Sequence, residues 1–386
     1  MTQRHFNKAL VGAASALGLA AAFNAGAAEM SFGDTDLSIY GMARGVASYS
    51  MDEDTDGDGG EATYNMTTSG EEGSTGHFDA DANTSRFGFI AELPNDVTTQ
   101  IEGDFYGDGF RLRHAYGEYN NVLAGQYWSN FTSFAGFTPT VDFNGSTGLA
   151  GTQGRNAQLR YTMGRLSVAL EDIDNSIDTL DDGDVVASGD EKQELPALTA
   201  KFADSVGNFD YAVAGLVDRL EVDGADGDDT TTGFAMFVDG GLDITDTVSV
   251  QGTFSYSDGA TSPGLYLADF YNGNAPDGYI EDGNIEKIEG MGGSLGVSMD
   301  AGPGAVNLAY GFTDVDVDDL VSAADAARVA NADQIREMRD SLHLNYIWNP
   351  TESVTYGVEA ARLSADEQSG ADNSATQLNF LAQYNF

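Results

Sequence analysis

The chain lacks cysteine altogether and is poor in proline and in basic residues. Its 386 residues include no Cys, 7 Pro and 17 Lys+Arg against 62 Asp+Glu, which gives a formal net charge of −45. Without cysteine there are no disulfides, thiolate metal sites or cysteine nucleophiles. The shortage of basic residues excludes a nucleic-acid binder with a general basic surface, since affinity for phosphates requires Lys and Arg to displace counterions.

The chain also lacks long apolar runs beyond its N-terminal region. No run of about 18 apolar residues occurs there, so helical membrane spans are not expected. A transmembrane β-barrel stays open, because its signal is alternation rather than a continuous apolar run. A barrel would also account for the length, since barrels of this size form one domain.

Residues 1–28 have the pattern of a secretory signal peptide. Two basic residues precede an apolar stretch from Ala9 to Phe23, and small residues follow up to Ala28. This order predicts export with cleavage after Ala27 or Ala28. A short membrane anchor is the alternative, but the apolar run is too short to span a bilayer. We expect the mature chain, residues 29–386, to reach the bacterial outer membrane.

Apolar and polar residues alternate with a period of two along most of the mature chain. In the last ten residues, Phe380, Tyr384 and Phe386 share one face, and Asn379 and Asn385 share the other. Such a strand suits lipid on one side and water on the other. The pattern predicts sixteen strands, at approximately 35–50, 83–93, 97–106, 109–119, 122–127, 155–163, 165–173, 195–204, 208–220, 230–241, 246–257, 288–300, 304–315, 336–348, 352–364 and 374–386.

Short turns and long loops alternate between these strands. The long loops are 51–82, 128–154, 174–194, 258–287 and 316–335. This asymmetry is typical of a transmembrane barrel, and a membrane requires the sheet to close because an open edge would leave backbone groups unpaired. The expected fold is therefore all-β, a 16-stranded antiparallel transmembrane β-barrel with long extracellular loops. A soluble β-sandwich or β-helix is the alternative. Segment 318–339 is expected to form a short loop helix.

No catalytic signature occurs in the sequence context that it requires. H-E-x-x-H and a Walker-type phosphate loop are absent, and G-x-S-x-G matches only Gly292–Gly296, which lies inside the predicted strand 288–300 and not at a strand-to-helix turn. Histidines 77, 114 and 343 remain after cleavage, and a histidine on a strand is more often a packing residue than a base. We expect no enzymatic activity and no cofactor. A barrel enzyme or an adhesin is the alternative from another functional class.

Six basic residues fall on the polar faces of predicted strands. An arginine on the lipid face at the midplane would cost ~2–4 kcal/mol, which favours the inward assignment. We interpret them as a basic ladder on one wall of a pore, where they attract carboxylate or phosphate groups. The alternative is internal pairing with Glu92, Glu102 and Asp104, which leaves little net charge. The six residues are Arg44, Arg86, Arg111, Arg113, Arg160 and Lys201.

Loop 128–154 differs in composition from the other long loops. It is aromatic and rich in glycine, and Asp142 is its single acid. An exposed loop of this apolarity would be unusual in so acidic a chain. We predict that it folds into the barrel and narrows the lumen, with Asp142 at the constriction. Four aromatic side chains would anchor it on the inner wall, namely Phe131, Phe134, Phe137 and Phe143. An external lid or a subunit contact is the alternative.

The other long loops are strongly acidic. Within loop 51–82, Asp54, Asp56 and Asp58 match the start of an EF-hand loop, but Asn65 stands where its bidentate glutamate is expected. These oxygen ligands could hold Ca²⁺ or Mg²⁺ at the surface and bridge lipopolysaccharide phosphates. The alternative, which we favour, is a solvated and mutually repelling loop.

Three segments carry a family resemblance. The sequences FRLRHAYGEY at 110–119, LAGQYWSNF at 123–131 and DFNG at 142–145 resemble the DcaP-like porins. The resemblance implies a trimeric sixteen-stranded barrel, a constricting third loop and an arginine-rich pore that favours dicarboxylates. It carries over to Arg111 and Arg113, and on weaker matches to arginines 44, 86 and 160. Family members can carry an N-terminal coiled coil, which we do not expect before the first strand here.

These observations together predict a passive channel of the outer membrane. We expect a homotrimer, in contact with the lipid bilayer and lipopolysaccharide, that passes small hydrophilic solutes and prefers small carboxylates or dicarboxylates. The alternative within the same class is a general porin that favours cations, because the acidic loops would surround its mouth.

Overall fold

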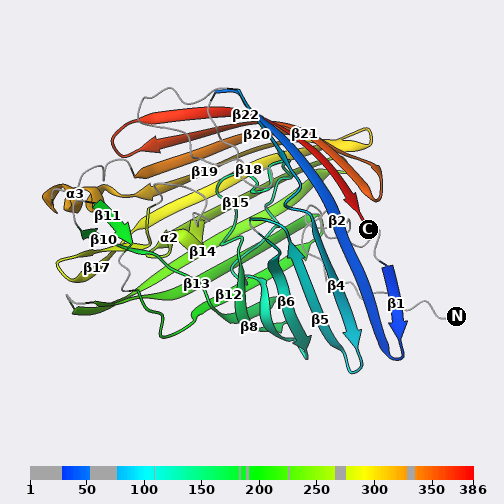
Figure 1. The fold of residues 1–386 in the computed structure, drawn as a ribbon, viewed down its shortest axis with the longest axis horizontal. Coiled ribbons are helices and arrows are strands. Elements are labelled where there is room, and N and C mark those ends of the chain that lie inside the picture. The colour runs from blue at the N-terminus through cyan, green and yellow to red at the C-terminus, as the bar shows by residue number, and fades with distance from the viewer. Residues whose placement is uncertain are drawn as a thin grey trace.

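The computed structural model describes residues 28–52, 76–107, 109–181, 184–187, 191–224, 227–265, 275–327 and 335–386. These residues form one large antiparallel sheet that closes on itself and a second, four-stranded sheet at one end of it (Figure 1). The predicted signal peptide lies outside the described residues, apart from Ala28, and stays a prediction.

Sixteen strands close the barrel, because each pairs antiparallel with the next and the last strand pairs with the first. All sixteen predicted strands are present, with ends that differ by a few residues. The strands are β2 (Thr35–Ser50), β4 (Arg86–Leu93), β5 (Val97–Asp104), β6 (Arg111–Tyr119), β7 (Val122–Trp128), β8 (Arg155–Met163), β9 (Leu166–Glu171), β12 (Ala197–Val206), β13 (Phe209–Gly224), β14 (Gly227–Thr245), β15 (Val248–Asp258), β18 (Glu289–Ala301), β19 (Gly304–Asp316), β20 (Arg336–Thr351), β21 (Val354–Glu367) and β22 (Asp372–Asn385).

The barrel has apolar side chains outside and polar side chains inside. On β22, Phe380 and Tyr384 are each 49% exposed, whereas Asn379 and Gln383 are buried. The same alternation occurs on β20, where Leu344 points outward and His343 is fully buried. This arrangement confirms the predicted faces and suits a wall between lipid and a polar interior.

The short turns and both ends of the described chain lie at one end of the barrel, the turn end (Figure 1). Asn120 and Asn121 form one turn with φ of 49° and 66°, a conformation that asparagine tolerates and that two-residue hairpins require. Strand β1 (Ala28–Phe32) pairs with the start of β2. Strands β1 and β22 lie one after the other along the same edge of β2. Phe386, directly after β22, hydrogen-bonds to Gly41, just beyond the residues of β2 that pair with β1.

The wall is uneven in height. The six consecutive strands β4 to β9 have between six and nine residues, whereas β13 has 16 and β14 has 19. At the opposite, loop end, β3 (His77–Asp81) pairs only with the last residues of β2. The barrel is therefore low along β4 to β9 and tall along β13 to β22.

The tall side carries a folded cap at the loop end. Its sheet consists of β10 (Ile177–Asp181), β11 (Asp184–Ala187), β16 (Gly278–Glu281) and β17 (Asn284–Lys287), in which β10 and β16 run parallel. This sheet was not predicted from the sequence. Its strands have only four or five residues, which is too few for alternation to be recognised.

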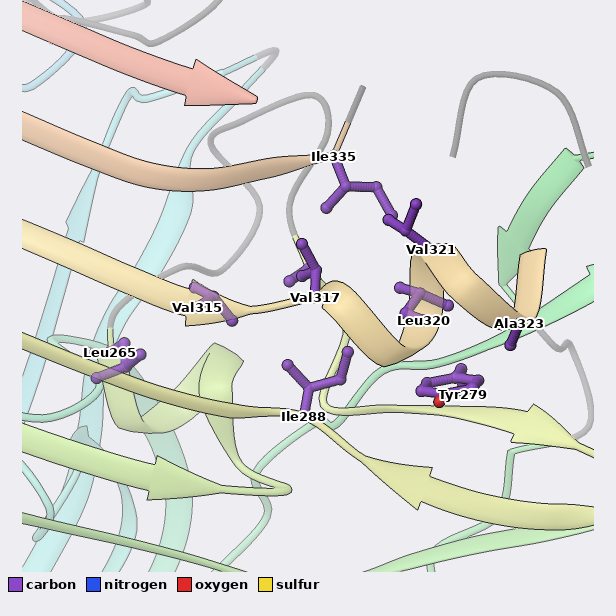
Figure 2. Packing of buried hydrophobic residues seen from close by; sticks show 10 residues of the cluster. Leu265, Tyr279, Ile288, Val315, Val317, Leu320, Val321, Ala323 and Ile335 are labelled. Atoms are coloured by element: carbon purple, nitrogen blue, oxygen red, sulfur yellow. The ribbon is translucent and has the colours of Figure 1, made fainter. Parts of the chain in front are cut away.

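Two short helices complete the cap, α2 (Thr261–Leu265) and α3 (Asp318–Ala327). Leu320 of α3 packs with Leu265 and Ile288 in a buried apolar cluster (Figure 2). The predicted helix over 318–339 was too long, because residues from Arg336 onward join β20 and pair with β19 and β21. Neither helix of the described chain is long and apolar enough to cross a membrane.

The Asp277 carboxylate joins two loops of the cap. It is fully buried and accepts hydrogen bonds from the backbone N–H groups of Ser176 and Ser262, both at 2.8 Å, and from the Thr261 hydroxyl at 3.1 Å. Burial raises the pKa of Asp277 above its ordinary value. Burial also raises the pKa of Asp178 to about 6, and the nearby Glu191 and Asp277 carboxylates add to this shift.

Placing a charge on the outer face is expected to destabilise the barrel. Leu344, on β20, is 52% exposed on the face assigned to lipid. The substitution Leu344→Arg should lower the free energy of unfolding in lipid vesicles by roughly 2–4 kcal/mol, measured by urea titration. Glu352→Arg, at the turn after β20, is the control and should change it little. Equal effects of the two substitutions would contradict the assignment of the faces.

The cap is expected to be more stable in mild acid. A carboxyl whose pKa is raised on folding contributes fully to stability only below its unfolded pKa. This contribution is lost as the pH rises through the folded pKa, which for Asp178 is about 6. Amide hydrogen exchange in β10 and β16, corrected for intrinsic rates, should therefore be slower at pH 5 than at pH 7.5. Asp178→Asn should reduce this pH dependence, and Asp246→Asn at the turn end should not. An unchanged pH dependence in Asp178→Asn would remove this carboxyl as its source.

Candidate functional site

The segment between β7 and β8, residues 129–154, attaches to the inner wall of the barrel. The backbone N–H of Asn130 donates to the Glu171 carboxylate on β9 at 2.9 Å, and that of Gly136 donates to Asp239 on β14 at 2.9 Å. Both carboxylates are buried. The segment is therefore held through its backbone at points on different strands.

Glycines on β18 and β19 let the loop lie directly on this wall. A Cβ atom at Gly311 would lie 1.8 Å from the Thr147 carbonyl oxygen, and one at Gly296 would lie 1.9 Å from the Thr138 hydroxyl oxygen. Only glycine permits so close an approach. The loop thus folds into the lumen as predicted, and the external lid is excluded.

The four predicted phenylalanines lie along this loop in different surroundings. Phe131 is fully buried, with its ring centroid 5.0 Å from that of Phe237 on β14. The Phe134 ring contacts Trp128 edge to face, with 5.1 Å between the ring centroids. It also contacts Phe137 edge to face, with 6.3 Å between the centroids. Phe143 lies instead against a group of arginines.

Arginines and acids alternate across the loop ends of three short strands. In the strand register, Arg86 on β4 lies opposite Asp104 on β5, which lies opposite Arg111 on β6. The guanidinium of Arg111 donates to both Asp104 oxygens, at 3.0 and 2.9 Å. This bidentate geometry fixes the direction of the arginine side chain.

A β-bulge adds Arg113 to this group. Glu102 pairs with His114 and the next residue, Gly103, pairs with Leu112, so Arg113 is the extra residue on β6. The bulge turns both Arg113 and His114 toward the interior, and both are buried. Bulges are common next to functional sites, where they redirect a side chain. Alternation places Arg113 on the same face as Arg111, but it would place the adjacent His114 on the opposite face.

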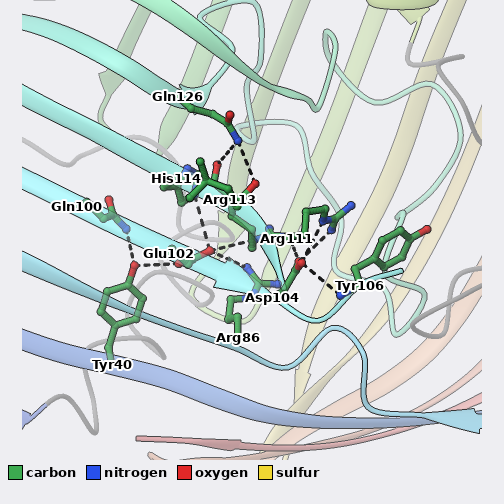
Figure 3. Close-up of polar contacts among 11 residues, drawn as sticks. Tyr40, Arg86, Gln100, Glu102, Asp104, Tyr106, Arg111, Arg113, His114 and Gln126 are labelled. Carbon is green, nitrogen blue, oxygen red and sulfur yellow. Dashed lines mark hydrogen bonds and ion pairs between the residues drawn. The ribbon is translucent and has the colours of Figure 1, made fainter. Parts of the chain in front are cut away.

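Glu102 and Asp104 are shared by several cations, as Figure 3 shows. Arg113 donates to Glu102 at 2.9 Å and to Asp104 at 2.7 Å. Arg86 lies 3.7 Å from Glu102, and the Tyr40 hydroxyl donates to the same carboxylate at 2.9 Å. The internal pairing that the sequence left open is therefore present for Glu102 and Asp104, whereas Glu92 lies exposed near the turn end.

We call this group the arginine cluster; its members among the described residues are Arg44, Arg86, Arg111 and Arg113, with Glu102 and Asp104. The Phe143 ring covers three of the four guanidinium groups, at 5.3 Å from Arg44, 6.0 Å from Arg86 and 5.9 Å from Arg113. Arg111 differs from the others, since its side chain is 39% exposed whereas that of Arg113 is 2% exposed.

The remaining predicted cations lie outside the cluster. Arg160 on β8 donates to Gln158 at 2.8 Å and lies near the Tyr127 ring, and the Lys201 ammonium on β12 donates to the Thr132 carbonyl at 2.7 Å. Sequence analysis missed Arg155, whose guanidinium lies 3.6 Å from the centre of the Trp128 ring. Its place opposite Trp128 in the register of β7 and β8 follows only from the strand pairing.

Asp142 and the metal ligands are the remaining predicted site residues. Asp142 is buried at the tip of the loop, where its carboxylate accepts the Asn144 N–H at 2.9 Å. Asp54, Asp56 and Asp58 lie outside the described residues, so a surface Ca²⁺ or Mg²⁺ site stays a prediction. Within the part of the chain that the structure describes, no group of three or more potential ligands could hold a metal ion.

The bridge through Asp104 is expected to stabilise the barrel. Asp104→Asn leaves Arg113 buried with less compensation, so the free energy of unfolding should fall by roughly 3 kcal/mol. Asp204→Asn is the matched control, because Asp204 pairs with the exposed Arg165 near the turn end and should cost at most about 1 kcal/mol. Urea titration of the refolded barrel measures both changes. Equal losses would show that the bridge adds no special stability.

Comparison with known proteins gives one family. The model of the DcaP outer membrane protein family matches residues 4–259. No curated protein sequence matches the chain. The crystal structure of the outer membrane channel DcaP of Acinetobacter baumannii is similar at 26% identity with a TM-score of 0.76, and the match covers 92% of this chain and 99% of that one.

More distant porin structures share the fold. An anion-selective porin from Comamonas acidovorans is 13% identical with a TM-score of 0.54, covering 91% of this chain and 100% of that one. OmpF of Salmonella typhi, in a complex with daunomycin, is 10% identical with a TM-score of 0.51, covering 93% and 100%. The closed barrel, its inward loop and the family match lead to one conclusion: the chain belongs to the DcaP outer membrane protein family and is a channel of the outer membrane.

Proposed function

We propose that the channel passes small hydrophilic solutes by diffusion and favours small carboxylates, including dicarboxylates. The observation that carries the proposal is the partly exposed guanidinium of Arg111, which Asp104 holds in place in the arginine cluster beside the loop that enters the lumen. A guanidinium held in place beside a constriction lowers the free energy of an anion there relative to a cation.

Arg111 is the member of the cluster that a passing solute can reach. Asp104 holds its guanidinium in place, and the Tyr106 ring lies 4.1 Å from it. A guanidinium fixed in this way can bind a carboxylate with two parallel hydrogen bonds. Asp104 already occupies some of the N–H donors of Arg111. A solute carboxylate therefore binds weakly enough to be released, which transport requires.

The buried arginines act differently in this proposal. Arg113 and Arg86 are too enclosed to touch a solute, and they contribute through their charge at a distance. Glu102 and Asp104 offset part of that charge. The resulting preference for anions is graded, so neutral and cationic solutes also pass.

A preference for cations is the competing function. The formal net charge of −45 favours it, because acidic loops at the mouth would concentrate cations. The two functions differ in where selectivity arises. The acidic mouth would set a preference for cations, and the arginine cluster would set a preference for anions. Assembly as a homotrimer, in contact with lipopolysaccharide and without a cofactor, belongs to the present proposal and rests on the family resemblance.

Neutralising Arg111 should reduce the anion preference. A unit charge about 5 Å from an ion in water contributes about 0.8 kcal/mol, so Arg111→Gln should lower the ratio of anion to cation permeability by roughly twofold to fourfold. The reversal potential of a planar bilayer under a gradient of potassium succinate measures the ratio. Arg165→Gln removes the same charge near the turn end and should leave it almost unchanged. A reversal potential that favours cations in the unmodified protein would sink the proposal.

A further inference from the structure

The tip of the inward loop is held through the backbone of one residue. The Val141 N–H donates to Glu359 on β21, and its carbonyl oxygen accepts from Arg44 on β2, both at 2.9 Å. The next N–H, that of Asp142, donates to the second oxygen of Glu359, also at 2.9 Å. The tip is thus fixed between an anion and a cation from different strands.

Glu359 is held in the wall by side chains from the two neighbouring strands. It is 4% exposed, and its oxygens accept hydrogen bonds from Asn345 on β20 at 3.0 Å and from Asn379 on β22 at 3.2 Å. Asn345 also donates to the Pro139 carbonyl at 2.9 Å, so it holds the same tip from a second side. The His343 ring lies 3.5 Å from the carboxylate.

Hydrogen bonds from backbone N–H groups to a carboxylate are about twice as strong as those between neutral groups. Two successive N–H groups converge here on one carboxylate. Removing its charge while keeping its shape would weaken both bonds together, while the hydrogen bonds from Arg44 and Asn345 to the tip would remain. Glu359 is therefore the anchor that receives both successive N–H groups of the tip.

The tip in turn positions Phe143. This residue follows Asp142 directly, and its ring covers the guanidinium groups of Arg44, Arg86 and Arg113. Moving the tip away from β21 would move the ring off these arginines and open the lumen beside them. The anchor on β21 is therefore linked to the arginine cluster, which begins on β2 with only β22 between the two strands.

We propose that Glu359 is a positioning residue that fixes the tip of the constriction loop, and thereby sets the width of the pore and the covering of the arginine cluster. It does not select solutes by its own charge, since both oxygens bind the loop and the wall. The inference deepens the proposed function, but it requires only that the chain is a channel.

Glu359→Gln tests the inference in single-channel recordings. The loosened tip should raise the mean conductance roughly twofold and add frequent transitions between conductance levels, as expected when a gating segment becomes mobile. Glu367→Gln is the matched control, because Glu367 lies on the same strand at its loop end and is also buried. It should leave the conductance and its noise unchanged. Unchanged recordings for Glu359→Gln would overturn the inference.

A labelling experiment gives a second, independent readout. Val141 is fully buried and the chain has no cysteine, so Val141→Cys introduces a single, similar-sized thiol. A membrane-impermeant thiol reagent should label it slowly in the otherwise unmodified barrel, and at least roughly tenfold faster when Glu359→Gln is added. Equal labelling rates would show that the tip does not depend on Glu359, even if the conductance differs.

The two proposals fail in different ways. If the anion preference is absent, the reversal potential shows it, and the conductance and labelling changes in Glu359→Gln are unaffected. If Glu359 is not the anchor, both of these changes are missing while the effect of Arg111→Gln on the reversal potential remains. Heat-modified mobility in gels confirms that each variant has formed the closed barrel.

Discussion

Closure of the backbone ladder is the constraint on which the rest of the structure depends. In hydrocarbon an unpaired N–H or C=O has no water to bind, so a spanning sheet must have no free edge. Strand β2 meets this requirement by pairing with β4 on one side and β22 on the other. Once the wall is closed, alternation sends every second side chain inward, and charged groups have no other place than the lumen.

The sequence contains enough information for the wall but not for its additions. Alternation predicts all sixteen barrel strands because lipid and water impose opposite requirements on neighbouring residues, such as Phe380 and Asn379. The cap contains short segments whose pairing depends on contacts between distant loops, such as that of Ile177 with Gly278. Those contacts leave no periodic signal in the chain.

The candidate site was predictable in part for similar reasons. The inward direction of Arg44, Arg86 and Arg111 follows from their neighbours on each strand. The burial of Arg113 beside His114 requires a bulge, which alternation does not reveal. The partners Asp104 and Arg155 depend on register, and the anchor Glu359 is more than two hundred residues away from Val141.

Acidic residues therefore have two distinct roles in one chain. Outside the barrel wall they give the molecule its large negative charge. Inside, Glu171, Asp239 and Glu359 bind backbone N–H groups of the inward loop, and Glu102 and Asp104 hold arginines. The net charge of the sequence is consequently a poor guide to the electrostatics of the lumen, where these five carboxylates are already engaged.

The low part of the wall has a consequence for the surrounding membrane. A strand needs about 9–11 residues to cross the hydrocarbon layer. Four of the six strands β4 to β9 have fewer than nine residues, and the other two have nine. Lipid chains beside this sector must shorten their span, at a modest cost for each ångström of mismatch. A second protein surface seated there would relieve that deformation. A neighbouring barrel that packed against this sector would thus replace the lipid with the largest hydrophobic mismatch.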